Sequence, residues 1–112
     1  MNRITDDYMR EMLGKTREYT IVILRPTPKR SEPEADQIVW EHGRRNFELR
    51  RDGILCIVCP VTDETDVAGL GIFSTNEEET GKIMDEDPAV KAGIFVYEIH
   101  PARSFPGDAL TK

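Results

Sequence analysis

The stretch WEHGRRNFELRRDGILCIVCP, residues 40–60, decides the fold, because it takes the chain from a helix directly into a strand. At 100° per residue, one side of this helix is mostly apolar, and His42 falls near the middle of that stripe. The stripe consists of Ile38, Leu49, His42, Ala35, Asn46 and Val39. Gly53 is suited to cap the helix in the left-handed conformation, and Ile54–Cys59 predicts a buried strand. The imidazole of His42 is therefore expected to point at the sheet, away from bulk water.

Length and charge limit the kind of protein this is. A chain of 112 residues predicts one domain with a single core. A formal charge of −6 disfavours non-specific binding to nucleic acid or to anionic lipid, because both need a basic surface. The sequence has no run of 18 apolar residues, and its charged N-terminus lacks a signal-peptide core. We therefore expect no nucleic-acid or membrane partner, and a cytoplasmic protein.

The two cysteines, Cys56 and Cys59, form a C-x-x-C spacing within the predicted strand. Strand alternation sends residues i and i+3 to opposite faces, so the spacing favours unbridged cysteines that fill the core over a redox pair. A zinc site would need further ligands from the scattered His42 and His100 or from carboxylates. Gly69 and Gly71 lack the third glycine of a dinucleotide fingerprint. The sequence thus predicts no metal and no cofactor.

The remaining elements follow from local patterns. Thr5 is a plausible N-cap for a short amphipathic helix, and Asp87-Pro88 ends or redirects a later one. The expected elements are a helix over 5–17, a strand over Tyr19–Leu24, a helix that ends near Asp52, strands over Ile54–Cys59 and near Leu70–Phe73, a helix over Asn76–Asp85 and a strand over Ile94–Ile99. We divide the chain into an N-terminal helical extension (1–18), a domain (19–101) and a mobile tail (102–112).

Without the first helix, the element order is β-α-β-β-α-β, which predicts an α+β, ferredoxin-like fold. The strands are apolar on both faces: Ile21 and Ile23 alternate with Val22 and Leu24, and the other strands behave similarly. Helices on one face would leave the second face uncovered. A symmetric homodimer that buries the second face of each sheet, a dimeric α+β barrel, is the simplest solution. Trp40 and Phe47 lie at i and i+7 on the far side of the long helix and suggest a further contact surface.

Several motifs resemble the YCII-related family of small dimeric α+β barrels, over about Tyr19–Pro101. They are a helical histidine, His42, at a set distance from Gly53; a strand ending in Pro60 with Asp63 shortly after; and EDPAVKAGIFVYEIHP, residues 86–101, with Asp87-Pro88, Ala92-Gly93 and Tyr97. The chain departs from the family at Cys59, where glycine is usual, and at Ala89, where an aromatic residue is often found.

The resemblance implies a pocket with a catalytic histidine–aspartate pair, here His42 and Asp63. An imidazole oriented by a carboxylate is a competent proton shuttle near neutral pH. Two alternatives stay open. His42 is a core histidine whose ring nitrogens are satisfied by Asn46 or a backbone carbonyl, or Asp63 is a turn residue in the segment TDETD.

Other polar residues are candidates for binding a small molecule. Arg25, at the end of the first strand, is placed to meet an anionic group, and Asn46 and Asp87 are further substrate-binding candidates. Asp87 also suits a structural role, accepting backbone N–H bonds in its turn. Arginines 44, 45, 50 and 51 scatter around the helix and favour a solvated surface. The sequence leaves three functions open: a cofactor-independent lyase, isomerase or dehydrohalogenase, a non-catalytic dimer that binds a small ligand, and a structural dimer.

Overall fold

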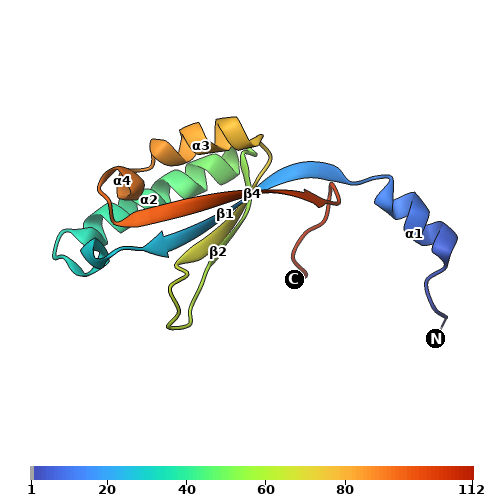
Figure 1. The fold of residues 1–112 in the computed structure, drawn as a ribbon, viewed down its shortest axis with the longest axis horizontal. Helices are drawn as coiled ribbons and strands as arrows, with labels where there is room; N and C mark the ends of the chain where they lie inside the picture. Colours follow the sequence, from blue (N-terminus) through green and yellow to red (C-terminus); the bar gives the residue numbers. More distant parts are fainter. Residues whose placement is uncertain (1) are drawn as a thin grey trace.

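A four-stranded antiparallel sheet with helices on one face forms the body of the protein (Figure 1). The computed structural model describes residues 2–112. The strands lie in the order β2-β3-β1-β4. The elements are α1 (Asp6–Leu13), β1 (Arg17–Pro26), the 3-10 helix η1 (Pro28–Ser31), α2 (Ala35–Arg51), β2 (Leu55–Pro60), β3 (Gly69–Phe73), α3 (Glu77–Asp85), α4 (Pro88–Lys91) and β4 (Phe95–Ser104). The predicted α+β, ferredoxin-like fold is confirmed.

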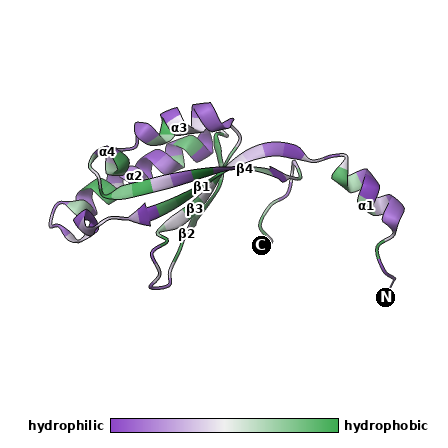
Figure 2. Cartoon of the chain, viewed as in Figure 1, coloured by the Kyte–Doolittle hydropathy of each residue, from purple (hydrophilic) through white to green (hydrophobic). Residues whose placement is uncertain are grey.

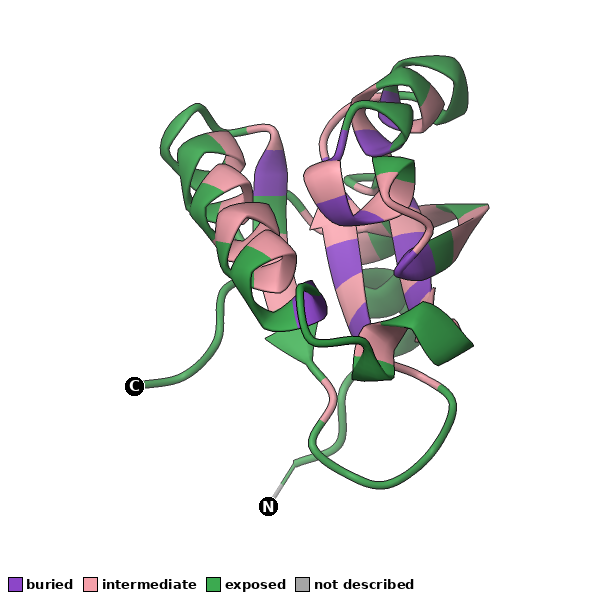
Figure 3. Ribbon diagram, turned by 90° about the vertical axis from the view of Figure 1, so that its left-hand side faces the viewer, coloured by how far each residue is buried: buried purple, intermediate pink, exposed green. Residues whose placement is uncertain are grey.

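The core lies between the sheet and the helices. In β1, Thr20, Val22 and Leu24 alternate with less buried residues, so one face of the strand is sealed. Figure 3 shows buried segments on the strands where helices cover them. Residues of α2 that were predicted to face the sheet pack there: Ala35 is buried, and Ile38, Val39 and Leu49 lie against the core. The helical stripe read from the sequence therefore gave the right orientation of α2.

The opposite face of the sheet, which we call the outer face, is apolar over much of β1, β2 and β3, carries charged and polar side chains at Arg25, Glu98 and His100, and has no helix over it in the part of the chain described. Its register follows from strand pairing: Ile72 on β3 lies beside Ile21 on β1 and Ile57 on β2. Val96, on the same face of β4, is 53% exposed. Figure 2 shows hydrophobic residues along these strands. The apolar part of the outer face thus has the composition of a buried surface, although nothing within residues 2–112 of one protomer covers it.

The prediction that the cysteines fill the core was wrong, since Cys56 and Cys59 are both exposed free thiols. The strand register shifts between Leu55 and Ile57, so Cys56 is the extra residue of a β-bulge. Cys59 pairs with Leu70 on the outer face of β2, an edge strand of the sheet. The prediction assumed strict alternation along residues 54–59 and therefore did not include the bulge. In addition, side chains on an edge strand are less buried than those on a central strand.

We expect Cys56 to react with an aromatic disulfide reagent in the native protein within minutes, because exposure gives the reagent access to its thiolate, and Cys59 to react as fast only where the outer face is uncovered. The measurement is the number of thiols titrated before and after denaturation. Cys56→Ser and Cys59→Ser variants assign each reacting thiol. A native protein in which Cys56 does not react until it unfolds would contradict the exposed position of its side chain.

The predicted N-terminal helix forms as α1, and its N-cap is Thr5, whose side chain accepts a hydrogen bond from the backbone N–H of Tyr8. None of its residues is buried. Beyond the sheet body, β1 and β4 continue as a two-stranded ribbon that pairs Arg17 with Ser104. Figure 1 shows this ribbon holding α1 away from the other helices. None of the helices within residues 2–112 has the length and apolar character needed to cross a membrane.

Several element boundaries differ from the sequence pattern. α1 ends at Leu13 and not near residue 17, and β1 runs from Arg17 to Pro26 and not from Tyr19 to Leu24. β4 runs to Ser104, past the predicted end at Ile99, because main-chain pairing with β1 continues where the apolar alternation stops. The segment after Asp87 forms the short helix α4, with Asp87 as its N-cap and Pro88 in its first turn. Gly93, at φ 74°, follows α4 and lets the chain turn into β4. At the other end of α4, Asp87 lies within hydrogen-bond distance of His42 on α2.

Candidate functional site

His42 lies on the face of α2 that covers the sheet, as its sequence position predicts, and its side chain is 13% exposed. Its Nδ1 lies 2.7 Å from Oδ1 of Asp87. Its ring meets Phe95 of β4 edge to face, with 5.4 Å between the ring centroids. The aromatic contact and the hydrogen bond fix the plane of the imidazole.

Asp87 is held by its position at the start of α4. Its Oδ2 accepts hydrogen bonds from the backbone N–H groups of Ala89, at 2.9 Å, and Val90, at 3.2 Å. Its side chain is 1% exposed. Burial raises the pKa of Asp87, but the hydrogen bond and charge of His42 and the two backbone N–H groups outweigh it, so the pKa lies below its ordinary value. Asp87 is therefore a carboxylate at neutral pH.

The ionisation of Asp87 decides which nitrogen of His42 carries a proton. A carboxylate only accepts hydrogen bonds, so Nδ1 of His42 is the donor in the 2.7 Å contact. In the neutral ring, Nε2 then keeps its lone pair. The side-chain amide of Asn46, one turn further along α2, donates to this lone pair at 3.3 Å, a long hydrogen bond. The pair therefore presents the unprotonated Nε2 of His42, which only a long hydrogen bond from the Asn46 amide covers.

Arg45 adds positive charge beside Asp87. Its Nη1 lies 3.8 Å from Oδ1 of Asp87, and within the described residues this buried nitrogen has no hydrogen-bond partner. The arginine cluster was interpreted from sequence as a solvated surface, and that is wrong for Arg45, whose side chain is only 25% exposed. Its helical angle lies beside that of His42, the one signal that could have separated it from its neighbours.

A cavity of about 280 Å³ opens beside His42, between α2 and the sheet. Its lining is apolar apart from His42 and Asn46, and Phe95 and Phe73 supply aromatic walls. The full lining is Val22, Leu24, Val39, His42, Gly43, Asn46, Leu55, Val58, Cys59, Pro60, Ala68, Gly69, Leu70, Gly71, Phe73, Met84 and Phe95. The volume suits one compact ring-sized molecule, and its two polar side chains gather on α2.

The floor of the cavity includes Gly69 and Gly71, the two glycines that lack the third member of a dinucleotide fingerprint. They occupy alternate positions on β3 and share its inner face. A Cβ on Gly71 would stand 3.1 Å from a side-chain atom of Leu55 and 3.2 Å from one of Phe73. A Cβ on Gly69 would stand 3.2 Å from the main-chain oxygen of Cys59, so neither lining position has room for a side chain without moving its neighbours.

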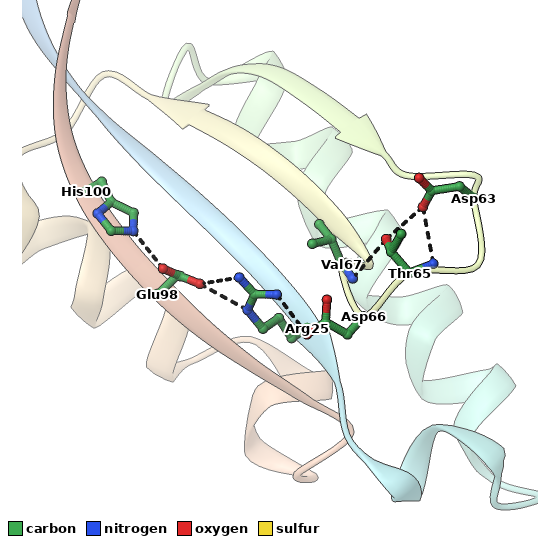
Figure 4. A network of polar contacts seen from close by, with 7 residues as sticks. All are labelled: Arg25, Asp63, Thr65, Asp66, Val67, Glu98 and His100. Atoms are coloured by element: carbon green, nitrogen blue, oxygen red, sulfur yellow. Dashed lines mark hydrogen bonds and ion pairs between the residues drawn. The ribbon is translucent and has the colours of Figure 1, made fainter.

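Asp63 is not the partner of His42, and the predicted pairing of the two was wrong. Asp63 lies in the loop after β2, where its Oδ1 accepts hydrogen bonds from the backbone N–H and the hydroxyl of Thr65 (Figure 4). This is the turn role that the sequence left as an alternative. Asp87, predicted to be a substrate-binding or structural residue, holds His42 instead.

Arg25 also lies away from the cavity. Leu24 faces the cavity, so the next residue of β1 points to the outer face of the sheet. There Arg25 contacts Glu98 at 2.7 Å and Asp66 at 3.1 Å, and Glu98 in turn contacts His100 (Figure 4). Hydrogen bonds from His100 and Arg25 hold the pKa of Glu98 below its ordinary value. Arg25 is thus committed to a polar network on the outer face, not to a ligand beside His42.

No cluster of three or more His, Cys, Asp or Glu side chains able to hold a metal ion occurs within residues 2–112. No protein-family model matches the chain. No curated protein matches it either.

Two solved structures are similar to this fold. One is 5-chloro-2-hydroxyhydroquinone dehydrochlorinase from Burkholderia phenoliruptrix in complex with 2,5-dihydroxybenzoquinone, with a TM-score of 0.54 and 18% identity over 73% of this chain and 90% of that one. The other is a dimeric ferredoxin-like protein from an uncultured marine organism, with a TM-score of 0.41 and 13% identity over 86% of this chain and 100% of that one. At 18% identity, the likeness to the dehydrochlorinase establishes a shared fold.

Proposed function

We propose that the protein is a small enzyme that uses His42 and Asp87 for general acid–base chemistry on a compact cyclic molecule. The observation that carries this proposal is the 2.7 Å contact between His42 Nδ1 and a buried carboxylate at the wall of an apolar cavity. A buried pair of this kind orients the ring and stabilises the imidazolium that forms when Nε2 takes a proton. The same pair would also serve a core histidine, but a core histidine needs no adjoining cavity.

The proposed reaction begins when a hydroxyl or an activated C–H of the substrate replaces the Asn46 amide at Nε2 of His42. Nε2 takes the proton, and the electron pair left on the substrate moves into its ring. The imidazolium is then stabilised by the Asp87 carboxylate. The proton either returns to another atom of the ring, which is an isomerisation, or stays while a halide leaves with the electron pair, which amounts to loss of a hydrogen halide.

The cavity limits the substrate class. About 280 Å³ of mostly apolar space, with His42 and Asn46 as its polar side chains, fits a single ring with acidic hydroxyl groups near those two residues. The similar dehydrochlorinase was solved with 2,5-dihydroxybenzoquinone, a compound of this size class. We propose a substrate of the same size class here. The shared fold and the motifs around His42 and Asp87-Pro88 also support membership of the YCII-related family. We propose a cytoplasmic location for the protein.

We also propose that the protein is a homodimer in which two outer faces pack together. Ile72, with Ile21 and Ile57 at its sides, forms the centre of an apolar surface that water would otherwise cover. Two-fold packing of such surfaces is the commonest form of soluble assembly. Polar residues at the margin, Arg25 and Glu98, are already paired within one protomer, so burying them leaves no lone charge.

The test uses 5-chloro-2-hydroxyhydroquinone for turnover, followed as chloride release, and 2,5-dihydroxybenzoquinone for binding. We expect turnover that falls about 10²-fold or more in His42→Gln, because the general base is lost. Asp87→Asn should also reduce kcat, whereas the matched change Asp63→Asn should leave kcat unchanged, since Asp63 lies in an exposed loop. Turnover that survives in His42→Gln, or a quinone that neither binds nor reacts, would refute the proposal.

A second candidate function, a non-catalytic binder of a small ligand, is supported by the same apolar cavity. It predicts that 2,5-dihydroxybenzoquinone binds while 5-chloro-2-hydroxyhydroquinone releases no chloride. In that case Gly71→Val should abolish binding, because its side chain would occupy the space between Leu55 and Phe73, and His42→Gln should weaken binding only modestly.

A further inference from the structure

Exposed apolar side chains are concentrated on two separate helical surfaces. The large hydrophobic residues exposed in the described chain are Ile4, Tyr8, Met9, Leu13, Trp40, Phe47, Val96 and Leu110. The first four belong to α1 and the residue before its cap, and Trp40 and Phe47 belong to α2. Six of these eight residues therefore form two surfaces, which is more than scattered exposure produces.

The surface on α1 lies on one side of the helix. Tyr8, Met9 and Leu13 are 48%, 51% and 57% exposed, and α1 contains no buried residue. At 100° per residue these side chains share one arc, while Asp7, Arg10 and Glu11 lie on the other. An amphipathic helix of eight residues gains little stability by itself in water, so its apolar side needs a partner.

The surface on α2 is shaped to receive a helix. Trp40 and Phe47 are each 67% exposed and lie two turns apart, with Gly43 between them along the helix. A Cβ built on Gly43 would meet no atom within 4 Å. A second helix can therefore approach the α2 backbone closely at Gly43 while Trp40 and Phe47 pack on either side of it.

The α1 helix cannot reach this surface on its own chain. Only residues 14–16 connect α1 to β1, and such a segment spans about 10 Å when extended. β1 pairs with β4 from Arg17 onward, so the connection starts from a fixed ribbon. In Figure 1, α1 lies at one end of a molecule 55 Å long, beyond the sheet, while α2 lies over the sheet. The partner of α1 must come from another molecule.

The charges on the two surfaces are complementary. Around α1, Asp6, Asp7 and Glu11 outnumber Arg10, which gives the helix two net negative charges. Near Phe47, Arg50 lies over the ring at 5.7 Å, whereas the exposed Arg44 and Arg51 already pair with Glu41 and Asp52. Opposite charge on these two surfaces favours a second copy of this acidic chain, and it disfavours an anionic lipid surface as the partner of α1.

We propose that α1 of one copy packs on the α2 surface formed by Trp40, Gly43 and Phe47 of a second copy, and that the second copy returns the same contact. The contact is an exchange of N-terminal arms, in which the β1–β4 ribbon carries α1 across to its neighbour. It does not depend on the chemistry proposed for His42.

Trp40 is the only tryptophan of the chain, so its fluorescence reports this contact directly. In the full-length protein, we expect acrylamide to quench Trp40 several-fold less than in a Met9→Asp variant, whose α1 presents a buried charge to the partner. Dilution of the wild type should raise its quenching toward that of the variant. Arg10→Asp is the matched control, because it adds an aspartate one residue away on the polar side of α1, and it should keep Trp40 shielded.

Sedimentation of the same samples separates this exchange from packing of the outer faces. Met9→Asp that remains dimeric while Trp40 becomes accessible supports the exchange, since the outer faces then hold the dimer without the arms. Equal quenching of Trp40 in the wild type and in both Met9→Asp and Leu13→Asp, at every concentration, would overturn it. So would a Trp40 that stays shielded in both variants, because α1 would not be what covers it.

Discussion

Replacing Asp87 with alanine should lower the free energy of unfolding by about 3 kcal/mol, the usual cost of breaking a buried charged pair by removing one partner. The change leaves His42 Nδ1 and the backbone N–H groups of Ala89 and Val90 without their acceptor. For a domain of this size, the midpoint of thermal unfolding should fall by about 15 °C. Urea unfolding followed by circular dichroism measures the change.

Asp87→Asn is the matched control, because its amide oxygen can still cap α4 while the negative charge beside His42 is lost. Its cost should be nearer 1 kcal/mol. The folded pKa of Asp87 lies below its ordinary value, so the stability supplied by the charge is present above about pH 4 and is lost as pH falls through the folded pKa. The gap between wild type and Asp87→Asn should therefore narrow in acid. An alanine variant as stable as the asparagine variant would refute the role of Asp87 as an acceptor for His42 and α4.

Ile72→Lys should convert the proposed homodimer into a 12.8 kDa monomer at micromolar concentration. The new ammonium would lie between Ile21 and Ile57 at the centre of the outer face, where packing against a second sheet would remove its water. We expect the dissociation constant to rise at least about 100-fold, which corresponds to roughly 3 kcal/mol. Sedimentation equilibrium measures it, and circular dichroism checks that the monomer is folded.

Leu110→Lys makes a comparable change from an apolar side chain to lysine at a residue that is 74% exposed near the C-terminus. This variant should remain dimeric. A wild type that sediments as a monomer at high micromolar concentration would show that the outer face is not the interface. An Ile72→Lys variant that dimerises as well as the wild type would show the same.

The parts of the site that depend on local sequence could be predicted. His42 faces the sheet because helical periodicity alone sets its direction, and Gly53, at φ 75°, ends α2 as a glycine at that place should. Asp87 accepts backbone N–H bonds because an Asp-Pro pair at a helix start favours that cap. Each of these depends on neighbours within about one helical turn.

The partner of His42 could not be predicted in this way. Asp87 is 45 residues away in the sequence, and the contact depends on how α4 packs against α2, which no local pattern encodes. Resemblance directed the pairing to Asp63, which had an equally good local explanation as a turn residue. The bulge at Cys56 had a similar effect, because one extra residue in β2 moves each side chain after it to the face opposite the one that strict alternation predicts.

The depth of the cavity depends on two glycine positions of β3, Gly69 and Gly71. A single-base change can turn a glycine codon into one for alanine or valine, and at Gly71 even the first added carbon would crowd Leu55 and Phe73. Descendants of this chain could therefore lose the hollow while keeping the sheet, the helices and the His42–Asp87 pair. In comparing such proteins, residues 69 and 71 should distinguish those with room for a ligand from those with a solid interior.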